Sequence, residues 1–177
     1  PHAYNLYQET GCPVHSMYPV YKILWLKKKQ PHLFKKTARF ISAKEYVFAR
    51  LTGEYVIDCC LAAGTGLLNT RSLQWNERSL EIAGIKSSQL SSLCYPEQVF
   101  YGINKRLARA MGISIDTPVV LGSADAVNSS LGAGALFPWQ ATCMIGTSGA
   151  LRVIYSQPIL DKKSRTWCYA IDKNHWL

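Results

Sequence analysis

PVVLGSAD, residues 118–125, is the stretch of sequence that decides the fold. Its apolar run 119–121 is short and continuous, which predicts a strand buried on both faces. A tight turn follows, and residues 126–131 have helical composition, so strand, turn and helix are expected in succession. Asp125 comes at the carboxyl end of the strand, where open α/β sheets place ligand-binding groups. We therefore expect an α/β fold with a candidate site at this turn.

The position of Asp125 leaves two interpretations open. Asp is among the best N-cap residues, so this carboxylate could simply cap the helix that follows. It could also accept the proton of a substrate hydroxyl, as aspartates of kinases do while a phosphoryl group is transferred. The sequence around Asp125 is compatible with both roles.

Downstream, a second candidate site lies between two β-type runs. Residues 140–145 and 151–155 flank Gly146-Thr147-Ser148-Gly149, which is the spacing of a hairpin. The two glycines would let a ligand approach the backbone closely, and N–H groups with two hydroxyls can surround phosphate oxygens. The same composition is also that of an ordinary hairpin turn. Pro138 is the expected seam between two domains.

Upstream, the first predicted helix covers residues 18–29. Pro31 is expected to end it, because proline cannot continue the backbone hydrogen bonds of a helix. The side chains predicted to share its buried stripe are Tyr18, Tyr21, Leu24 and Trp25.

Three further helices are predicted from cap residues before their first turns and glycines after their last. Ser42, with Glu45 three positions later, has the spacing of a capping box. The predicted ranges are 43–51, 77–83 and 104–111.

Length and composition exclude several classes of protein. The chain has 177 residues, of which 48% are hydrophobic and 18% charged, as in a globular protein of one domain or one domain plus part of another. No apolar run approaches the roughly 18 residues of a membrane span. Six cysteines without a C-x-x-C pair favour reduced thiols and a cytoplasmic location. His15 near Cys12 is too little for a metal site, so we expect no metal held by protein ligands alone.

The net charge of +9 suggests an anionic partner. Lysine runs such as 27–29 have no interleaved aromatic residues, so they predict solvated faces and no nucleic-acid partner. The alternative from another class is a basic binding module without chemistry. That alternative would be recognised by a steep loss of DNA or RNA affinity with added salt.

Taken together, these motifs resemble the FGGY carbohydrate kinases. Downstream, the resemblance rests on residues 118–125 and on Ile145 to Gly149. Upstream, it rests on Thr10 to Pro13, Lys22 to Leu26, Ser42 to Tyr46, Leu51 to Glu54, Asp58, and Thr65 to Leu67. Within the family, residues 13–19, 146–152 and 167–169 look most like gluconokinases, with xylulokinases and glycerol kinases as relatives.

The resemblance implies a fold of two actin-like, ribonuclease-H-like domains with ATP and sugar in the cleft between them. Residues 1–136 resemble the later part of the first, sugar-binding domain, and residues 137–177 resemble the first strands of the second, nucleotide-binding domain. The family's amino-terminal phosphate hairpin and its glycine-rich adenosine motif are expected before and after this chain. We therefore expect the chain to be a fragment that is inactive alone.

The resemblance also implies an activity, which is ATP-dependent phosphorylation of a sugar or sugar acid. Gluconate giving 6-phosphogluconate is the best single expectation, and xylulose, glycerol or a related polyol is the alternative. Asp125 resembles the general base, and Gly146-Thr147-Ser148-Gly149 resembles the turn that contacts the nucleotide phosphates. Mg²⁺ would be held largely through water and nucleotide.

Two further residues are expected near the sugar. Met17 falls where some relatives have a tyrosine lining the sugar pocket, and Ala126 falls beside the base, where several relatives carry Asn or Gln. Unpaired sheet edges would favour association, so a homodimer is the expected assembly.

Overall fold

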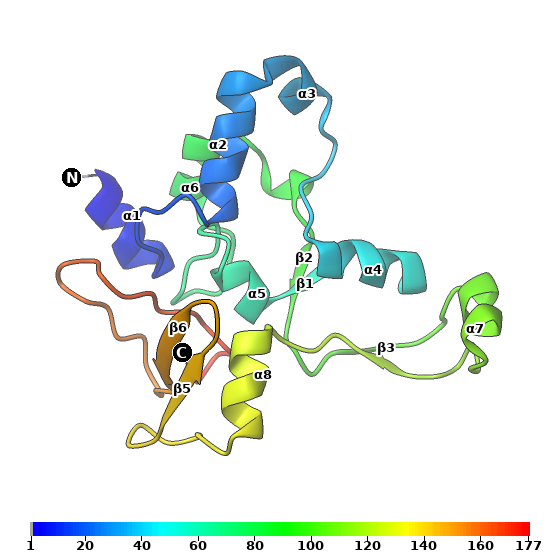
Figure 1. Ribbon diagram of the computed structural model, residues 1–177. Helices are drawn as coiled ribbons and strands as arrows, with labels where there is room; N and C mark the ends of the chain where they lie inside the picture. The colour runs from blue at the N-terminus through cyan, green and yellow to red at the C-terminus, as the bar shows by residue number, and fades with distance from the viewer. Residues whose placement is uncertain (1) are drawn as a thin grey trace.

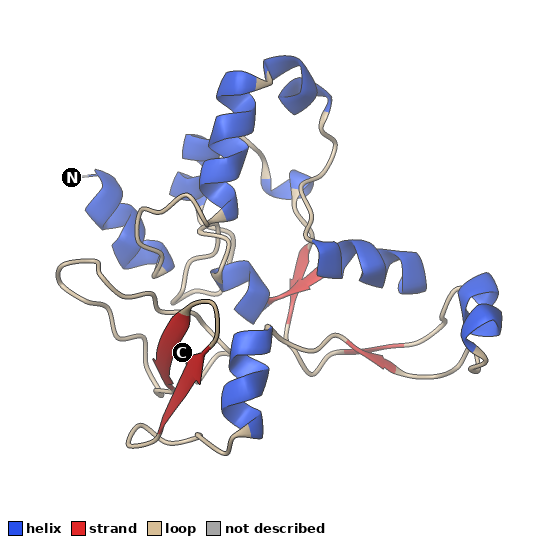
Figure 2. Cartoon of the chain, viewed as in Figure 1, coloured by secondary structure: helices blue, strands red, loops and turns tan. Residues whose placement is uncertain are grey.

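The computed structural model describes residues 2–177, which begin with four helices and continue as a mixture of helices and strands (Figure 1, Figure 2). The helices are α1 (His2–Thr10), α2 (Pro19–Lys29), α3 (Pro31–Lys36), α4 (Ala43–Thr52), α5 (Cys59–Ala63), α6 (Glu77–Ala83), the 3₁₀ helix η1 (Ser87–Gln89), α7 (Lys105–Met111) and α8 (Asp125–Gly132). The strands are β1 (Val56–Asp58), β2 (Ser92–Cys94), β3 (Val99–Phe100), β4 (Val119–Val120), β5 (Ala141–Ile145) and β6 (Gly149–Val153). The predicted α/β class is confirmed.

The strands form three two-stranded units among the described residues. β1 and β2 are parallel, and the chain between them contains α5 and α6, as the crossover of a parallel pair requires. β3 and β4 are antiparallel, and so are β5 and β6, whose register pairs Ala141 with Val153 and Ile145 with Gly149. The predicted hairpin around residues 146–149 is therefore confirmed.

The prediction that the strand at residues 119–121 is buried on both faces was wrong. β4 includes only Val119 and Val120, and the side chain of Val120 is 57% exposed, whereas Leu121 just after the strand is buried. The reason is that β4 pairs with β3 alone among the described residues, and this ribbon reaches out toward α7 (Figure 1). A two-stranded ribbon leaves most of its surface open to solvent.

The predicted helix ends depend on local caps, and the structure confirms them. Ser42 Oγ accepts a hydrogen bond from the Glu45 N–H at 3.3 Å, while the Glu45 carboxylate accepts from the Ser42 N–H at 2.7 Å, which completes the capping box of α4. The side chains of Asn76 and Asn104 cap α6 and α7 by accepting from backbone N–H groups of the first turn, without the reciprocal bond of a capping box. Both helices and α4 end at a glycine with positive φ.

The predicted buried stripe of α2 was only partly right. Val20 and Ile23 are the buried residues of the helix, whereas Trp25 is 57% exposed. Tyr18 is buried, but it is the N-cap residue. Pro31 does not simply end α2, because it is also the first residue of α3, a position where its missing N–H costs nothing.

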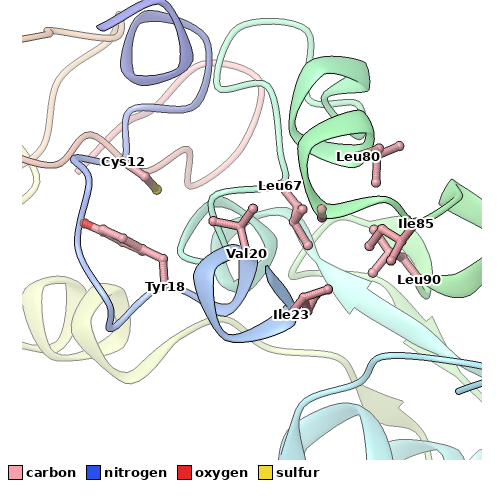
Figure 3. Packing of buried hydrophobic residues seen from close by; sticks show 9 residues of the cluster. Cys12, Tyr18, Val20, Ile23, Leu67, Leu80, Ile85 and Leu90 are labelled. Atoms are coloured by element: carbon pink, nitrogen blue, oxygen red, sulfur yellow. The ribbon is translucent and has the colours of Figure 1, made fainter. Parts of the chain in front are cut away.

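The core around α2 gathers side chains from distant parts of the sequence (Figure 3). Val20 and Ile23 from α2 meet Leu67 and Leu80 there, together with Leu90 after η1. Burial of each such aliphatic side chain contributes about 1.5–3 kcal/mol. This cluster holds α2 and α6 against each other.

The last residues of the chain return to the first part of the molecule, where the red segment of Figure 1 runs beside α5. The Cys168 N–H donates to the Gly11 carbonyl at 2.9 Å, and the Trp176 indole N–H donates to the Thr70 carbonyl at 2.7 Å. A second cluster joins Cys60 of α5 to Val127 of α8 and Ile171 near the C-terminus. The segment after β6 therefore ties the hairpin region to residues 11–70. No helix among residues 2–177 combines the length and apolar character that crossing a bilayer demands.

Candidate active site

The candidate site begins at the loop between β4 and α8. The Leu121 N–H donates to the Gln98 carbonyl at 2.9 Å, and the Gly122 N–H donates to the Pro96 carbonyl at 2.8 Å. Gly122 has φ of +69°, a left-handed conformation that glycine adopts without steric cost. The chain thus leaves the strand, turns at Gly122 and enters α8 three residues later.

Asp125 is the first residue of α8, and the N-cap position belongs to Ala124. The N-cap interpretation of Asp125 was therefore wrong: its Oδ1 accepts from the neighbouring Ala126 N–H at 2.7 Å, one residue ahead and not two or three. The side chain is exposed. An exposed carboxylate in this place is accessible to a substrate hydroxyl.

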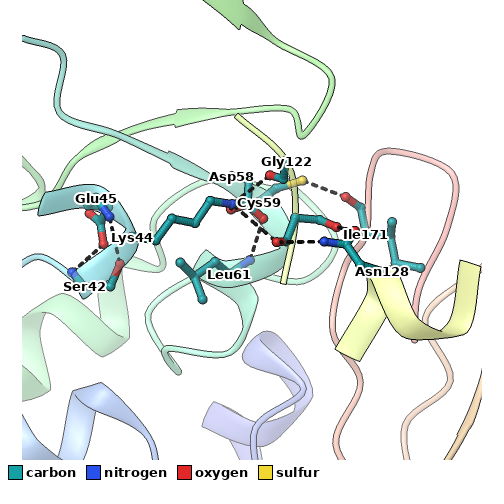
Figure 4. A network of polar contacts seen from close by, with 10 residues as sticks. Ser42, Lys44, Glu45, Asp58, Cys59, Leu61, Gly122, Asn128 and Ile171 are labelled. Carbon is teal, nitrogen blue, oxygen red and sulfur yellow. Dashed lines mark hydrogen bonds and ion pairs between the residues drawn. The ribbon is translucent and has the colours of Figure 1, made fainter. Parts of the chain in front are cut away.

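An ion pair between the half-buried Lys44 and the fully buried Asp58 lies behind the loop (Figure 4). Lys44 of α4 places Nζ 2.6 Å from Asp58 Oδ2, and the same ammonium donates to the Gly122 carbonyl at 2.8 Å. Asp58 has no exposed side-chain surface, and its Oδ1 caps α5 by accepting from the Leu61 N–H at 2.8 Å. The pair joins α4, the end of β1 and the loop before Asp125. Neither residue was assigned a role from the sequence, although an Asp directly after a buried strand and before a short helix was a signal for the cap.

Side-chain hydrogen bonds lie near both ends of α8. Ser123 Oγ donates to Asn128 Oδ1 at 2.5 Å, which closes the first turn. Further along, the hydroxyls of Ser130 and Thr142 lie 2.8 Å apart and join α8 to β5. Asp125 is therefore carried by a helix that packs on the predicted phosphate hairpin.

The 146–149 turn lies at the same end of this unit as Asp125. Helix α8 runs in one direction and β5 returns in the other (Figure 1). Asp125 precedes Ser130 in α8, which at 1.5 Å per residue places it about 7.5 Å from the contact between Ser130 and Thr142, toward the start of the helix. Gly146 follows Thr142 and lies about 13 Å from the same contact, toward the end of the strand. The Gly146 N–H donates to the Ser148 carbonyl at 3.0 Å, and all residues from Gly146 to Gly149 are exposed.

The residues predicted near the sugar differ in their surroundings. Ala126 is half-buried and packs against the cluster that contains Cys60 and Val127. Met17 is 56% exposed, and its N–H donates to Nδ1 of His15 at 3.2 Å. The hydrogen bonds of residues 2–177 do not link Met17 to Asp125, so its place in a sugar pocket stays a prediction.

The thiols near the site are structural groups. Burial raises the pKa of Cys60, which lies beside Ala124, to about 12, and it does the same for Cys59, which donates to the Ile171 carbonyl at 3.0 Å. Such thiols stay protonated at neutral pH and are poor nucleophiles. All six cysteines are in the thiol form.

No group of three His, Cys, Asp or Glu side chains gathers within residues 2–177 in a way that could hold a metal ion. The exposed Asp125 carboxylate is a single acidic group, which fits Mg²⁺ held mainly by water and nucleotide oxygens.

A large apolar cavity lies away from this site. It has a volume of 560 Å³, is bounded by α2, α4 and β1, and includes Trp25, Ile57 and Trp75 in its lining. Its walls carry few polar groups and do not include Asp125. Chemistry on a polyol requires polar partners, so we place the candidate site at the loop and not in the cavity.

Solved structures with the fold of this α/β chain are sugar kinases of the actin-like class. The profile of the FGGY family of carbohydrate kinases, N-terminal domain, matches residues 2–132. The chain therefore belongs to the FGGY family of carbohydrate kinases.

Individual relatives cover nearly the whole chain. A gluconokinase from Bacillus licheniformis is 41% identical over 174 residues, which are 98% of this chain and 34% of the relative. The solved structure of a gluconate kinase from Lactobacillus acidophilus matches with a TM-score of 0.95 at 40% identity, over 98% of this chain and 35% of that one. A ligand-bound xylulose kinase structure from the same species matches equally well, with a TM-score of 0.95 at 40% identity over 98% of this chain and 36% of that one. The chain thus spans about one third of the length of these relatives.

Proposed function

We propose that the protein containing this chain catalyses ATP-dependent phosphorylation of a sugar or sugar acid, with gluconate as substrate and 6-phosphogluconate as product. The observation that carries the proposal is the exposed Asp125 carboxylate at the start of α8, at the same end as the 146–149 turn. Support for gluconate comes from the relatives named gluconokinase, which are 40–41% identical to this chain.

In the proposed reaction, Asp125 is the general base. Its carboxylate accepts the proton of the sugar hydroxyl as that oxygen bonds to the γ-phosphorus of ATP, and the bond to the β-phosphate oxygen breaks to release ADP. A positioned base of this kind contributes about 10²- to 10⁴-fold to the rate. Bound Mg²⁺ would supply charge compensation on the phosphate oxygens.

The remaining contacts follow from the same arrangement. The N–H groups of Gly146 to Gly149 and the hydroxyls of Thr147 and Ser148 would contact the nucleotide phosphates. Met17 and Ala126 would lie beside the sugar. ATP and gluconate are both anions, so the net charge of +9 suits both ligands without any nucleic acid.

The domain assignment is part of the proposal. Residues 1–136 would be the later part of the sugar-binding domain, and residues 137–177 the first strands of the nucleotide-binding domain. The contacts of residues 154–177 with the region around Gly11 and Thr70 would then hold the two domains in register across the cleft. A homodimer and a cytoplasmic location stay predictions from the sequence.

The test is a coupled ADP-release assay of the full-length protein with gluconate, xylulose, glycerol and related polyols. We expect the highest kcat/KM with gluconate. Turnover of a polyol but of no sugar acid would overturn gluconate as the substrate. Absence of turnover with every sugar, at ATP concentrations that saturate a measured binding site, would overturn the kinase proposal itself.

A further inference from the structure

We propose that Lys44 is a positioning residue for Asp125, because it ties the loop that carries this carboxylate to the buried Asp58. The inference rests on the proposed function because that function makes Asp125 the general base that must be positioned. The link between Lys44 and the loop is independent of that function, and the experiment below tests the two separately.

Three elements meet at the Lys44 ammonium (Figure 4). Its Nζ donates to Asp58 Oδ2 at 2.6 Å, to the Gly122 carbonyl at 2.8 Å and to the Ser123 carbonyl at 3.5 Å. An ammonium has three hydrogens, so all of its donors have a partner. Both Asp58 oxygens are also satisfied, since Oδ1 accepts from the Leu61 N–H.

Two of these elements provide fixed ends. Lys44 lies in the first turn of α4, which the capping box of Ser42 and Glu45 closes, and Glu45 is only 3% exposed. Asp58 lies at the end of β1, where it is fully buried and caps α5. The ammonium therefore presents a fixed point of positive charge to whatever lies against it.

The loop is the third element. Apolar contacts hold its two ends, because Leu121 is buried in a cluster with Phe48 and Val56 and Ala124 packs on the cluster that contains Cys60, whereas Gly122 and Ser123 form its middle. A Cβ at Gly122 would meet no atom within 4 Å, so no side chain packs over that residue. The bonds between Ser123 and Asn128 stay within the loop and the first turn of α8. The Gly122 N–H donates to the Pro96 carbonyl and so links the loop to the connection between β2 and β3. Lys44 is thus the charged side chain that holds the middle of this loop, through the carbonyls of Gly122 and Ser123.

Displacement of the loop would reach the carboxylate directly. Ser123 precedes Asp125 by two residues, and the intervening Ala124 is the N-cap of α8. A misplacement of about 1 Å at a catalytic group can lower the rate by about 100-fold. Lys44 would therefore act on the rate through Asp125 without contacting the substrate.

The experiment must separate positioning from simple stability. Lys44→Met alone leaves the Asp58 charge buried without a partner, which destabilises a protein whatever the role of the lysine. The double variant Lys44→Met/Asp58→Asn removes both charges, and the asparagine can still accept from the Leu61 N–H. The double variant would recover stability, but it would still lack the hydrogen bond to the Gly122 carbonyl. Arg78→Met is the matched control, because it breaks the partly exposed Arg78–Glu9 pair, which joins α6 to α1 away from the loop.

Three measurements on the full-length protein decide the inference. We expect the double variant to melt within a few degrees of wild type, with kcat on gluconate about 10- to 100-fold lower and the KM for ATP within twofold. Lys44→Arg, which keeps a cation and several donors, should recover part of the kcat. Hydrogen exchange of the peptide covering residues 121–126 should be faster in Lys44→Met and in the double variant, and unchanged in Arg78→Met.

The outcomes are distinguishable. Wild-type kcat in a stable double variant would overturn the positioning role. An inactive wild-type protein would instead refute the proposed function, and hydrogen exchange would still decide whether Lys44 holds the loop. Unchanged exchange at residues 121–126 in both Lys44 variants would overturn the inference whatever the activity.

Discussion

Replacement of Gly11 by alanine tests the contact that brings the last residues of the chain back to the first part of the molecule. Gly11 has φ of +70°, and a Cβ added there would overlap the backbone carbonyl oxygen of Cys168. No side-chain rotation can relieve an overlap with backbone. The substitution must therefore push apart the two segments that the Cys168 N–H to Gly11 carbonyl bond joins at 2.9 Å.

The magnitude follows from three contributions. The left-handed conformation costs an L-residue about 1–2 kcal/mol. Loss of the hydrogen bond adds about 0.5–1.5 kcal/mol, and displacement of the packed backbone adds about 1–3 kcal/mol. We expect Gly11→Ala to lower the free energy of unfolding by about 2.5–6.5 kcal/mol in total. Gly53→Ala is the matched control, because Gly53 has φ of +84° but no atom within 4 Å of an added Cβ, so only the first contribution applies.

The assay is urea unfolding of the full-length protein and both variants, followed by tryptophan fluorescence. The free energy of unfolding should fall by about 1–2 kcal/mol in Gly53→Ala and by clearly more in Gly11→Ala. Equal losses within about 0.5 kcal/mol, which is the usual error of such comparisons, would refute the close contact between Gly11 and Cys168. They would also remove the argument that this segment holds the hairpin in place.

The other predictions concern titratable groups and are measured on the same protein. Iodoacetamide at pH 8 should modify the exposed Cys143 before the buried Cys12 and Cys60, because burial raises the pKa of both buried thiols to about 12. Mass spectrometry of the labelled peptides would show the order of modification, and early labelling of Cys60 would contradict the prediction. The free energy of unfolding should be level below pH 9 and fall between about pH 9 and 12. Burial also raises the Tyr18 pKa to about 12, so Tyr18, Cys12 and Cys60 ionise at lower pH in the unfolded chain than in the folded one. A urea midpoint that does not change between about pH 9 and 12 would argue against their burial.

Features set by neighbouring residues were predictable from the sequence. The capping box of Ser42 and Glu45 and the glycine that ends α4 are local, because the groups that bond lie within a few residues of each other. The hairpin around residues 146–149 was found for the same reason. Features that depend on distant partners were missed. The exposure of Val120 follows from how few strands lie beside β4, which no local pattern encodes.

In the candidate site, too, local features were predictable from the sequence and long-range contacts were not. The placement of Asp125 after a strand and at the start of a helix was predicted, whereas its exact cap position was wrong by one residue. The link from Lys44 to Asp58 and Gly122 spans separations of 14 and 78 residues, so only the folded chain brings these groups together. The segments that carry the family resemblance include both Lys44 and Asp58, but the pairing of these residues depends on tertiary structure.

The most direct test of the account compares Asp125→Asn with the wild-type full-length protein. Asparagine keeps the size of the side chain and an acceptor for the Ala126 N–H, but it cannot take a proton from a sugar hydroxyl. Calorimetry would measure the affinity for ATP, and the coupled ADP-release assay with gluconate would measure kcat. The account predicts an ATP affinity within about twofold of wild type and a kcat lower by about 100-fold or more. A variant that binds ATP and turns over gluconate at nearly the wild-type rate would contradict the assignment of Asp125 as the base.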